Sequence, residues 1–388
     1  MTPRRVMIIA GEASGDMYGA ELASAIHRFD PDIQFKGMGG DKMAAAGVGL
    51  VADAESVSVV GIAEAIPALE HIITTLRAVR RTLKRWRPDL LVLIDFPDFN
   101  LKVAKVAHAL KIPILYYICP QIWAWRKGRL ALFRKLIDRL AVILPFEETF
   151  WRKNGMKATY VGHPLLDLPP FDAEKTDPGN GAQRTVALLP GSRQKEIHTH
   201  LPLLLSAAGK MRQIDPTLKF CIALSGDRYQ QLVSDSLGAV NMEAVCEVTI
   251  SGARMLFPRC DLAIAASGTV TLEAALAKVP TVVIYKVSSI SYWVGKSMVR
   301  VPFISLPNLI ANEAVFPELI QKEANAENIV RSAMAFLEND DLRRRVIQRL
   351  EGVKRRLGNG GTAVKVARIA LQMMSRKMNE NSESFKIH

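Results

Sequence analysis

The chain has 388 residues, of which 49% are hydrophobic, and a formal net charge of +13. This length suits two domains, and the positive charge predicts an anionic partner, either a phosphorylated substrate, an anionic membrane surface or nucleic acid. Nucleic acid ranks last, because no stretch interleaves aromatic and basic residues as nucleic-acid-binding motifs do. No apolar run is long enough to span a bilayer, so any membrane contact should be peripheral. The four cysteines form no CxxC pair, as expected of reduced thiols in a cytosolic protein.

The N-terminal half opens with a buried strand and a glycine-rich turn. Residues 6–10 (VMIIA) form a continuous apolar run, and the turn GEASGD, 11–16, follows before a helical pattern. The turn is not GxGxxG, so a dinucleotide site is not supported. Glu12 makes it acidic, which favours sugar hydroxyls over phosphate, whereas Asp16 is expected to cap the following helix. A second glycine-dense stretch, 37–49, is expected to be a loop.

The stretch 57–87 is apolar at first and strongly basic at its end. It can be an amphipathic helix with its basic face in solvent. It can also be a membrane-surface element whose apolar residues enter the acyl boundary while its cations meet anionic headgroups. We favour the second interpretation, because the apolar residues before Pro67 are more than one helix face needs. The apolar set comprises Val59, Val60, Ile62, Ile66, Leu69, Ile72, Ile73 and Leu76.

A buried strand, 89–94 (DLLVLI), delivers two carboxylates to its carboxyl end. Asp95 and Asp98 in DFPDFN are separated by a proline and are candidates for a positioned general base. The residues alone leave open which of the two is the base. Asn100 is expected to cap the helix that follows.

Two tryptophans and one histidine of this half are also considered as ligand-binding residues. Trp123 and Trp125 stand beside a basic run and can be either core or a platform for sugar and acyl groups. His163 has no second ligand at metal spacing, so no metal site is predicted.

Strand–helix alternation occurs on both sides of a linker rich in Pro, Gly and Asp. It predicts an α/β protein with two Rossmann-like, doubly wound domains. The expected boundaries are an N-terminal domain over 1–168, the linker over 169–183, a C-terminal domain over 184–360, and a terminal helix and tail over 361–388.

The segment 185–197, TVALLPGSRQKEI, is a buried strand that breaks at a Pro-Gly-Ser turn. Such a turn exposes backbone N–H groups and the guanidinium of Arg193 at the carboxyl end of a sheet, which suits a diphosphate. An ordinary turn with a solvent-exposed arginine is the alternative. The residues concerned are Gly191, Ser192, Arg193 and Gln194.

A second such site follows the strand DLAIAA. Ser267, Gly268 and Thr269 precede a helix, whose N-terminus can bind phosphate, and Ser267 is a candidate N-cap. Glu273 lies about one and a half turns inside this helix, where a carboxylate can accept two hydrogen bonds from a ribose diol. Asn308 in SLPNL is expected on a rigid turn that presents its amide.

Nine motifs stand in order across the chain: GEASGD, GMGGDKM, DFPDFN, CPQIWAWR, LPFE, VGHPLLD, LLPGSRQKEI, ASGTVTLE and SLPNLIA. Together they closely resemble the lipid-A-disaccharide synthase family. The resemblance implies a GT-B fold with the active site in a cleft between the two domains. It implies an inverting hexosyl transfer from UDP-2,3-diacylglucosamine to 2,3-diacylglucosamine 1-phosphate (lipid X), giving β-1,6-linked lipid A disaccharide 1-phosphate and UDP. Family members are peripheral proteins on the cytoplasmic face of the Gram-negative inner membrane.

The resemblance also implies roles for the candidate residues. The C-terminal domain would hold the UDP-sugar, with Arg193 and the helix N-terminus at 267–269 neutralising the leaving diphosphate. Glu273 would hold the ribose, and Asn308 and Gln194 would orient the donor or its phosphate. In the N-terminal domain Asp98, with Asp95 as competitor, would take the proton of the attacking 6-hydroxyl. Glu12 would bind a sugar hydroxyl or help to position that base. No metal or other cofactor is required, and a homodimer through the C-terminal helices is one hypothesis.

Two other functions compete with this interpretation. The first is another GT-B enzyme that acts on a UDP-sugar, either an epimerase or the transferase that adds N-acetylglucosamine to a lipid-linked muropeptide. DFPDFN and IWAWR argue against both. The second is a membrane-bound protein that binds a UDP-sugar or lipid without catalysis, and the aspartate pair argues against it.

Overall fold

The computed structural model describes residues 3–53, 65–125, 127–169, 171, 183–224, 226–287 and 301–385. The chain divides into two compact units. Unit 1 comprises Met1–Leu168 and Asn359–His388, and unit 2 comprises Pro169–Gly358. Among the described helices, none combines the length and apolarity that a membrane span needs.

Unit 1 contains a seven-stranded sheet in the order β3-β2-β1-β4-β5-β6-β7, with every pair parallel. The strands are β1 Arg5–Ala10, β2 Gln34–Gly39, β3 Val48–Asp53, β4 Leu90–Ile94, β5 Ile114–Tyr117, β6 Arg139–Val142 and β7 Ala158–Tyr160. The continuous apolar runs of β1 and β4 follow from burial of both sheet faces. Met7 and Ile9 belong to one core cluster, and the alternate residues Ile8 and Ala10 belong to the other.

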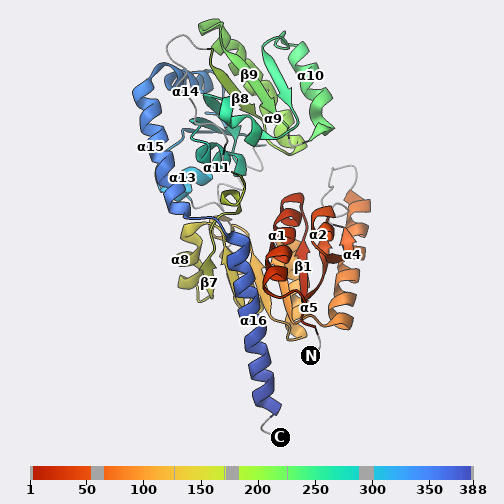
Figure 1. Ribbon diagram of the computed structural model, residues 1–388. Helices are drawn as coiled ribbons and strands as arrows, with labels where there is room; N and C mark the ends of the chain where they lie inside the picture. Colours follow the sequence, from red (N-terminus) through yellow and green to blue (C-terminus); the bar gives the residue numbers. More distant parts are fainter. Residues whose placement is uncertain are drawn as a thin grey trace. The chain divides into compact units, whose positions relative to one another are not determined.

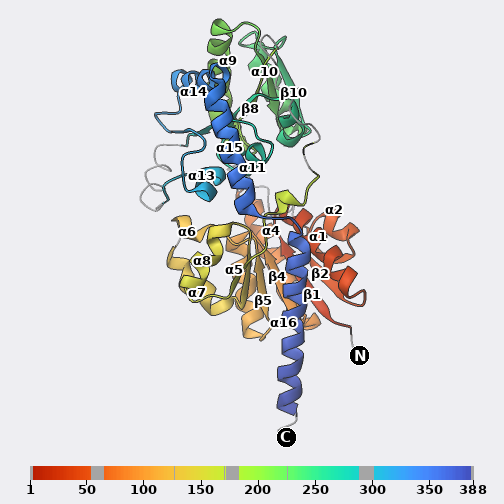
Figure 2. The same cartoon turned by 60° about the vertical axis from the view of Figure 1, so that its left-hand side comes forward.

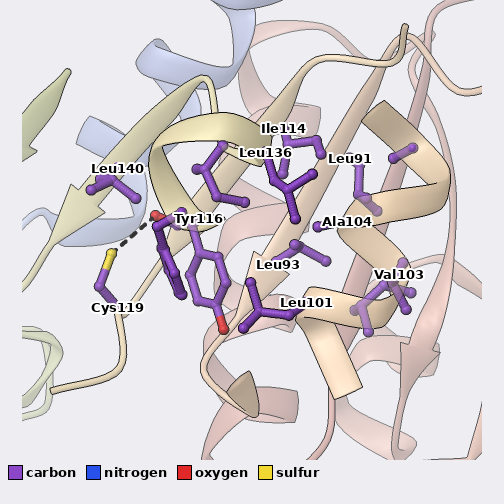
Figure 3. Packing of buried hydrophobic residues seen from close by; sticks show 14 of the residues in the cluster. Leu91, Leu93, Leu101, Val103, Ala104, Ile114, Tyr116, Cys119, Leu136 and Leu140 are labelled. Carbon is purple, nitrogen blue, oxygen red and sulfur yellow. Dashed lines mark hydrogen bonds between the residues drawn. The ribbon is translucent and has the colours of Figure 1, made fainter. Parts of the chain in front are cut away.

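Helices cover both faces of this sheet (Figure 1). They are α1 Ala13–Phe29, α2 Asp41–Ala45, α4 Ala65–Trp86, α5 Pro97–Ala109, α6 Ile122–Trp125, η2 Lys127–Arg129, α7 Leu130–Leu136, α8 Pro145–Lys153, η3 Pro164–Leu166 and α16 Thr362–Phe385. The cluster beneath α4, α5, α7 and α8 includes Tyr116, which is fully buried. Figure 3 shows this ring among Leu93, Leu101 and Leu136, with the Cys119 thiol donating to the Tyr116 carbonyl.

The C-terminal helix α16 belongs to unit 1, although the whole of unit 2 precedes it in the chain. It lies beside α1 in both views (Figure 1, Figure 2). Val366, Ala367 and Ala370 are fully buried in the core cluster that contains Ile8. Asp167 accepts hydrogen bonds from the first backbone amides of this helix segment, including that of Thr362 at 2.9 Å. The helix therefore completes one apolar layer of unit 1.

Unit 2 contains a six-stranded parallel sheet in the order β10-β9-β8-β11-β12-β13. The strands are β8 Thr185–Leu189, β9 Lys219–Ala223, β10 Cys246–Thr249, β11 Leu262–Ala266, β12 Thr281–Tyr285 and β13 Glu318–Ile320. The helices are α9 Gln194–Ile214, η4 Asp227–Tyr229, α10 Gln230–Gly238, η5 Ala253–Met255, η6 Phe257–Arg259, α11 Thr269–Leu276, α13 Leu306–Ala311, α14 Ala326–Glu338 and α15 Asp340–Leu357. Helix α14 packs on α9, β11 and β12, and the cluster around Phe257 covers the other set of strand side chains. Strand β13 was not predicted, because three residues carry too little periodicity.

The glycine-rich segments of unit 1 are more regular than expected. Helix α1 already begins at Ala13, inside the predicted turn, and β2 extends through Gly39. The prediction that 37–49 is a loop is therefore wrong over much of its length. Asp16 is a capping residue, as expected, but of another helix, since its carboxylate accepts from the amides of Gly40, Lys42 and Met43 at the start of α2.

Helix α4 is amphipathic over its described side chains. Leu76, Val79 and Leu83 are buried in the core, whereas Arg80 and Lys84 are exposed. Of the apolar set proposed for membrane contact, Leu76 is core, Ile72 packs against the core, and Ile73 is 38% exposed. The side chains of Val59, Val60, Ile62, Ile66 and Leu69 lie outside the described residues.

Candidate functional site

Both sheets place the candidate residues at the point where the strand order reverses. In unit 1, β1 pairs with β4, and the chain leaves these neighbours in opposite directions. In unit 2, β8 and β11 stand in the same relation. In doubly wound sheets the loops at such a switch point diverge and leave a crevice at the carboxyl ends of the strands. Each unit therefore has a candidate ligand-binding position at its switch point, and the sequence motifs fall on both.

In unit 1, the residues after β1 and β4 bring the predicted carboxylates to neighbouring strand ends. Ala10 is in register with Ile94, so Glu12 and the pair Asp95 and Asp98 follow adjacent strands. Glu12 and Asp98 are exposed, and Asp95 is half-buried. Glu12 precedes α1 as its N-cap but makes no side-chain capping bond. Its carboxylate is therefore accessible to a ligand.

The turn between β4 and α5 has a strained backbone. Asp95 and Phe96 have φ values of 43° and 45°, which non-glycine residues rarely adopt. The Phe96 ring lies so close to Gly11 that a Cβ there would come within 2.3 Å of it. Consecutive left-handed residues cost free energy and persist only where the surroundings hold them, which is common at functional sites.

Asn100 and Tyr116 hold this turn from beneath. The Asn100 amide donates to the carbonyls of Asp95 at 2.7 Å and Ile94 at 3.2 Å, and the Tyr116 hydroxyl donates to Asp95 O at 2.5 Å. Burial raises the pKa of Tyr116 well above its ordinary value, so the hydroxyl keeps the proton that it donates. The prediction that Asn100 caps the helix is wrong, because Asn100 lies inside α5 and is fully buried.

Arg129, which sequence reasoning missed, contacts the candidate base. Its Nη2 lies 2.5 Å from Asp98 Oδ1, and the Asp98 side chain is 69% exposed. Asp98 occupies the first turn of α5, where a carboxylate also interacts favourably with the helix dipole. Thirty-one positions separate the two residues, and no local pattern signals their contact.

The tryptophan motif is in part structural. Trp123 is 8% exposed, and its indole donates to Glu147 Oε1 at 3.0 Å, so it is core rather than a ligand platform. The Trp125 side chain lies outside the described residues. Glu147 also accepts from Leu144 N at 3.1 Å. Burial raises the pKa of Glu147 to about 7 despite these hydrogen bonds.

This buried carboxyl should make stability depend on pH. The unfolded chain ionises Glu147 near its ordinary pKa of 4.5, whereas the folded chain keeps the proton until about 7. Its contribution to stability therefore falls as pH rises between these values and is constant above them. The loss should be about 3 kcal/mol and absent from Glu147→Gln. Urea unfolding of both proteins at about pH 5 and pH 8 measures it.

Glu148→Gln is the matched control, since this neighbouring carboxylate is ion-paired with Arg152 at 2.7 Å and only half-buried. It should retain the wild-type pH dependence. Parallel pH dependence in wild type and Glu147→Gln would contradict the assignment.

His163 is buried and serves the local backbone. Its Nδ1 accepts from Leu165 N at 3.2 Å, and burial lowers its pKa to about 4. The ring is therefore neutral at physiological pH. Among the residues that the structure describes, no group of three or more His, Cys, Asp or Glu side chains is placed to hold a metal ion.

In unit 2, the Pro-Gly-Ser turn after β8 leads into α9 with its amides already engaged. Glu196 Oε2 accepts from Ser192 N at 3.0 Å and Arg193 N at 3.2 Å. Gly191 has a φ of 116°, and a Cβ there would lie 2.5 Å from the Glu196 carboxylate. Ser192, Arg193 and Gln194 are exposed. Because Glu196 occupies the backbone donors, the exposed guanidinium is the more available group for an anion.

His200 fixes the same turn from the core. Its Nε2 accepts from Lys286 N at 3.2 Å, which leaves the proton on Nδ1, 2.8 Å from the Pro190 carbonyl. Through these two hydrogen bonds, His200 connects α9 to the residues that follow β8 and β12. The sequence showed only a histidine on a helix, and nothing in the pattern indicated this role.

The residues after β11 lie beside this turn, since Leu189 is in register with Ala265. Gly268, not Ser267, is the N-cap of α11, and the Ser267 hydroxyl donates to Ile304 O at 3.0 Å. Gly268 and Thr269 are exposed. Burial raises the pKa of Glu273, and the nearby Arg254 opposes this shift. Glu273 is half-buried within α11.

Asn308 does not lie on an exposed turn. It is fully buried inside α13, where its amide donates to Phe316 O and to Glu318 Oε1, both at 2.8 Å. Its Oδ1 accepts from the amides of Val315 and Phe316. The prediction that Asn308 presents its amide to a ligand is wrong, because these four hydrogen bonds occupy the side-chain amide inside unit 2. Glu318, which was missed, also accepts from Ser305 N and Oγ, and so anchors the start of α13.

A family model described as lipid-A-disaccharide synthetase matches residues 6–371. Lipid-A-disaccharide synthase of Geobacter sulfurreducens is 39% identical over 387 residues, covering 97% of this chain and 99% of that protein. The protein of the same name from Myxococcus xanthus is 40% identical over 381 residues, covering 96% of this chain and 98% of its own length.

Solved structures resemble the chain in fold. UDP-GlcNAc 2-epimerase from Neisseria meningitidis, bound to UDP-GlcNAc, matches with a TM-score of 0.65 at 11% identity, covering 95% of this chain and 100% of that one. Acinetobacter baumannii MurG matches with a TM-score of 0.57 at 15% identity, with the same two coverages. At these identities the likeness is one of fold, and it confirms the GT-B class of paired parallel α/β sheets.

Proposed function

The chain belongs to the lipid-A-disaccharide synthase family and is a glycosyltransferase that forms a lipid A disaccharide, and we propose that it joins UDP-2,3-diacylglucosamine to lipid X. The observation that supports this most is the placement of the two motif sets. Carboxylates follow β1 and β4 in unit 1, and the PGSR and SGT segments follow β8 and β11 in unit 2. Each set stands where a doubly wound sheet binds its ligand.

In this proposal unit 1 binds the acceptor. The acceptor is neutral at its 6-hydroxyl, so the proton must leave as the new bond forms. Asp98 is the general base, with Asp95 as the competitor, since Asp98 is the more exposed of the two. Glu12 is exposed and binds a sugar hydroxyl.

Unit 2 binds the UDP-sugar. Arg193, Gln194 and the small residues 267–269 face the diphosphate, and Glu273 takes the ribose. Asn308 is buried, so its role in this proposal is to hold α13 in position and not to contact the donor. The acceptor O6 forms a bond to donor C1 with inversion while Asp98 takes the O6 proton. The C1–O bond breaks, and UDP leaves with the electron pair, whose charge Arg193 stabilises.

The membrane location belongs to the same proposal. We place the protein peripherally on the cytoplasmic face of the inner membrane, where its diacylated substrates reside. The exposed cations of α4, among them Arg77, Arg80, Arg81, Lys84 and Arg85, suit an anionic lipid surface. Co-sedimentation with anionic vesicles that weakens as salt rises is the expected behaviour.

The proposed reaction is tested by UDP release in mild detergent. The mixture contains both acylated substrates and EDTA, and mass spectrometry identifies the products. We expect UDP in equal amount to a tetra-acylated disaccharide 1-phosphate. UDP without the disaccharide would indicate hydrolysis or another acceptor. Tight UDP binding without release would favour a binding protein, and turnover of unacylated UDP-GlcNAc would favour an epimerase or a muropeptide-lipid transferase.

A further inference from the structure

We propose that Arg129 is both the receptor for the acceptor's phosphate and the group that holds Asp98 until that phosphate arrives. The inference rests on the proposed function, since it concerns the base and the acceptor of that reaction. It adds a residue that determines acceptor specificity. It also couples correct acceptor binding to release of the base.

The first observation is the ion pair itself. Arg129 Nη2 lies 2.5 Å from Asp98 Oδ1. Arg129 comes from η2, just before α7, and Asp98 comes from the first turn of α5. The Arg129 side chain is 28% exposed, whereas Asp98 is 69% exposed. The arginine is thus the better-anchored partner, and the aspartate faces solvent.

The second observation is an unused arm of the same guanidinium. Arg129 Nη1 is buried and has no hydrogen-bond partner among the residues that the structure describes. A buried donor without a partner carries a desolvation cost. Guanidinium groups characteristically meet phosphate through two parallel N–H donors. Nη1 can therefore donate to a phosphate oxygen without breaking an existing bond, whereas Nη2 must first leave Asp98.

The pair has a consequence for catalysis. A carboxylate beside a guanidinium is stabilised in its charged form and accepts a proton less readily. The helix N-terminus acts on Asp98 in the same direction. While the ion pair with Arg129 persists, the Asp98 carboxylate is a poorer general base. In this proposal Asp98 takes the proton after Arg129 has moved to another anion.

The acceptor carries that anion. A sugar 1-phosphate is a phosphate monoester with close to two negative charges at neutral pH and three acceptor oxygens. Ion pairs as exposed as that of Asp98 contribute little to stability, so a dianion that engages both arms of Arg129 can displace the carboxylate. An acceptor without the phosphate does not displace Asp98 from Arg129, so the ion pair persists. The enzyme thereby selects phosphorylated acceptors at the step that prepares the base.

The test compares two acceptors that differ only at C1, one with the 1-phosphate and one with a free 1-hydroxyl. Wild type should prefer the phosphorylated acceptor. Arg129→Ala should reduce the ratio of their kcat/KM values about tenfold to a hundredfold, the effect of losing charge-assisted hydrogen bonds. The reduction should come from a higher KM for the phosphorylated acceptor. Turnover of the unphosphorylated acceptor should rise, because Asp98 loses its ion pair with Arg129. Inorganic phosphate should compete with the acceptor in wild type but not in Arg129→Ala.

Arg134→Ala is the matched control, since Arg134 lies exposed on α7 and the substitution removes the same charge. It should leave the ratio unchanged. Where Arg129→Ala does not fold, Arg129→Lys keeps the charge without the fork and should lower the ratio in the same direction.

Two results would overturn the inference alone: equal loss with both acceptors, or loss of UDP binding in Arg129→Ala, which would place Arg129 on the donor side. Failure of the wild-type protein to form any disaccharide would instead overturn the proposed function, and this inference with it.

Discussion

Replacing Asp98 by asparagine should lower turnover by about a hundredfold to ten thousandfold, the range in which a positioned general base contributes. Asparagine keeps the shape of the side chain but cannot take the proton of the acceptor hydroxyl. The fold should be unaffected, because Asp98 is 69% exposed and its pair with Arg129 stabilises little. UDP binding should also persist, since the proposal places the donor on unit 2. Single-turnover disaccharide formation and UDP titration measure the two effects.

Asp95→Asn is the comparison that decides between the two carboxylates. The Asp95 side chain is half-buried, and the backbone carbonyl of this residue, not its carboxylate, receives the bonds from Asn100 and Tyr116. If Asp95→Asn abolishes transfer while Asp98→Asn remains active, Asp95 is the base. Loss of thermal stability in Asp95→Asn alone would instead mark a structural role at the strained turn.

Replacing Arg193 by alanine should lower turnover by about a hundredfold to a thousandfold, the effect of removing one donor from a site of developing negative charge. The reason lies in the surrounding donors. Glu196 already accepts from the amides of Ser192 and Arg193, so the exposed Arg193 guanidinium is the fully charged donor of this turn that a diphosphate can reach. Its side chain is 78% exposed and contacts Glu196 at 3.3 Å, which leaves it able to turn toward a ligand.

Arg212→Ala controls for the loss of one positive charge from α9. Arg212 lies in the last turn of that helix and donates to Pro216 O at 3.0 Å. It should retain wild-type turnover. The measurement is kcat and KM for the UDP-sugar at saturating acceptor, and unchanged kcat in Arg193→Ala would remove this residue from the site.

Much of the architecture could be predicted from local patterns. The strands at 6–10, 90–94, 185–189 and 262–266 were recognised because each is a short apolar run between turn signals. Alternation of strands and helices implies parallel sheets, and parallel sheets bind ligands at the carboxyl ends of their strands. Motifs that follow strands were therefore correctly expected to gather at these ends.

Polar residues inside the elements were the least predictable. An asparagine in the sequence can be an exposed helix cap or a buried residue, and the local pattern does not distinguish the two. Only the packing around Asn100 and Asn308 shows that both are buried. Asp16 caps a helix that begins 25 positions later in the sequence numbering, at Asp41, because α1 and α2 pack together. Such bonds depend on which elements become neighbours, and periodicity carries no information about that.

By itself the sequence determined the fold class, the family and the position of each motif relative to its strand, because all three follow from residues close together in the chain. Only the tertiary structure decided that α16 completes unit 1, that His200 supports the Pro190 turn, and that Arg129 meets Asp98. These contacts join residues that are remote in sequence. Their free energy comes from burial and charge pairing after the sheets have formed, and no local pattern encodes it.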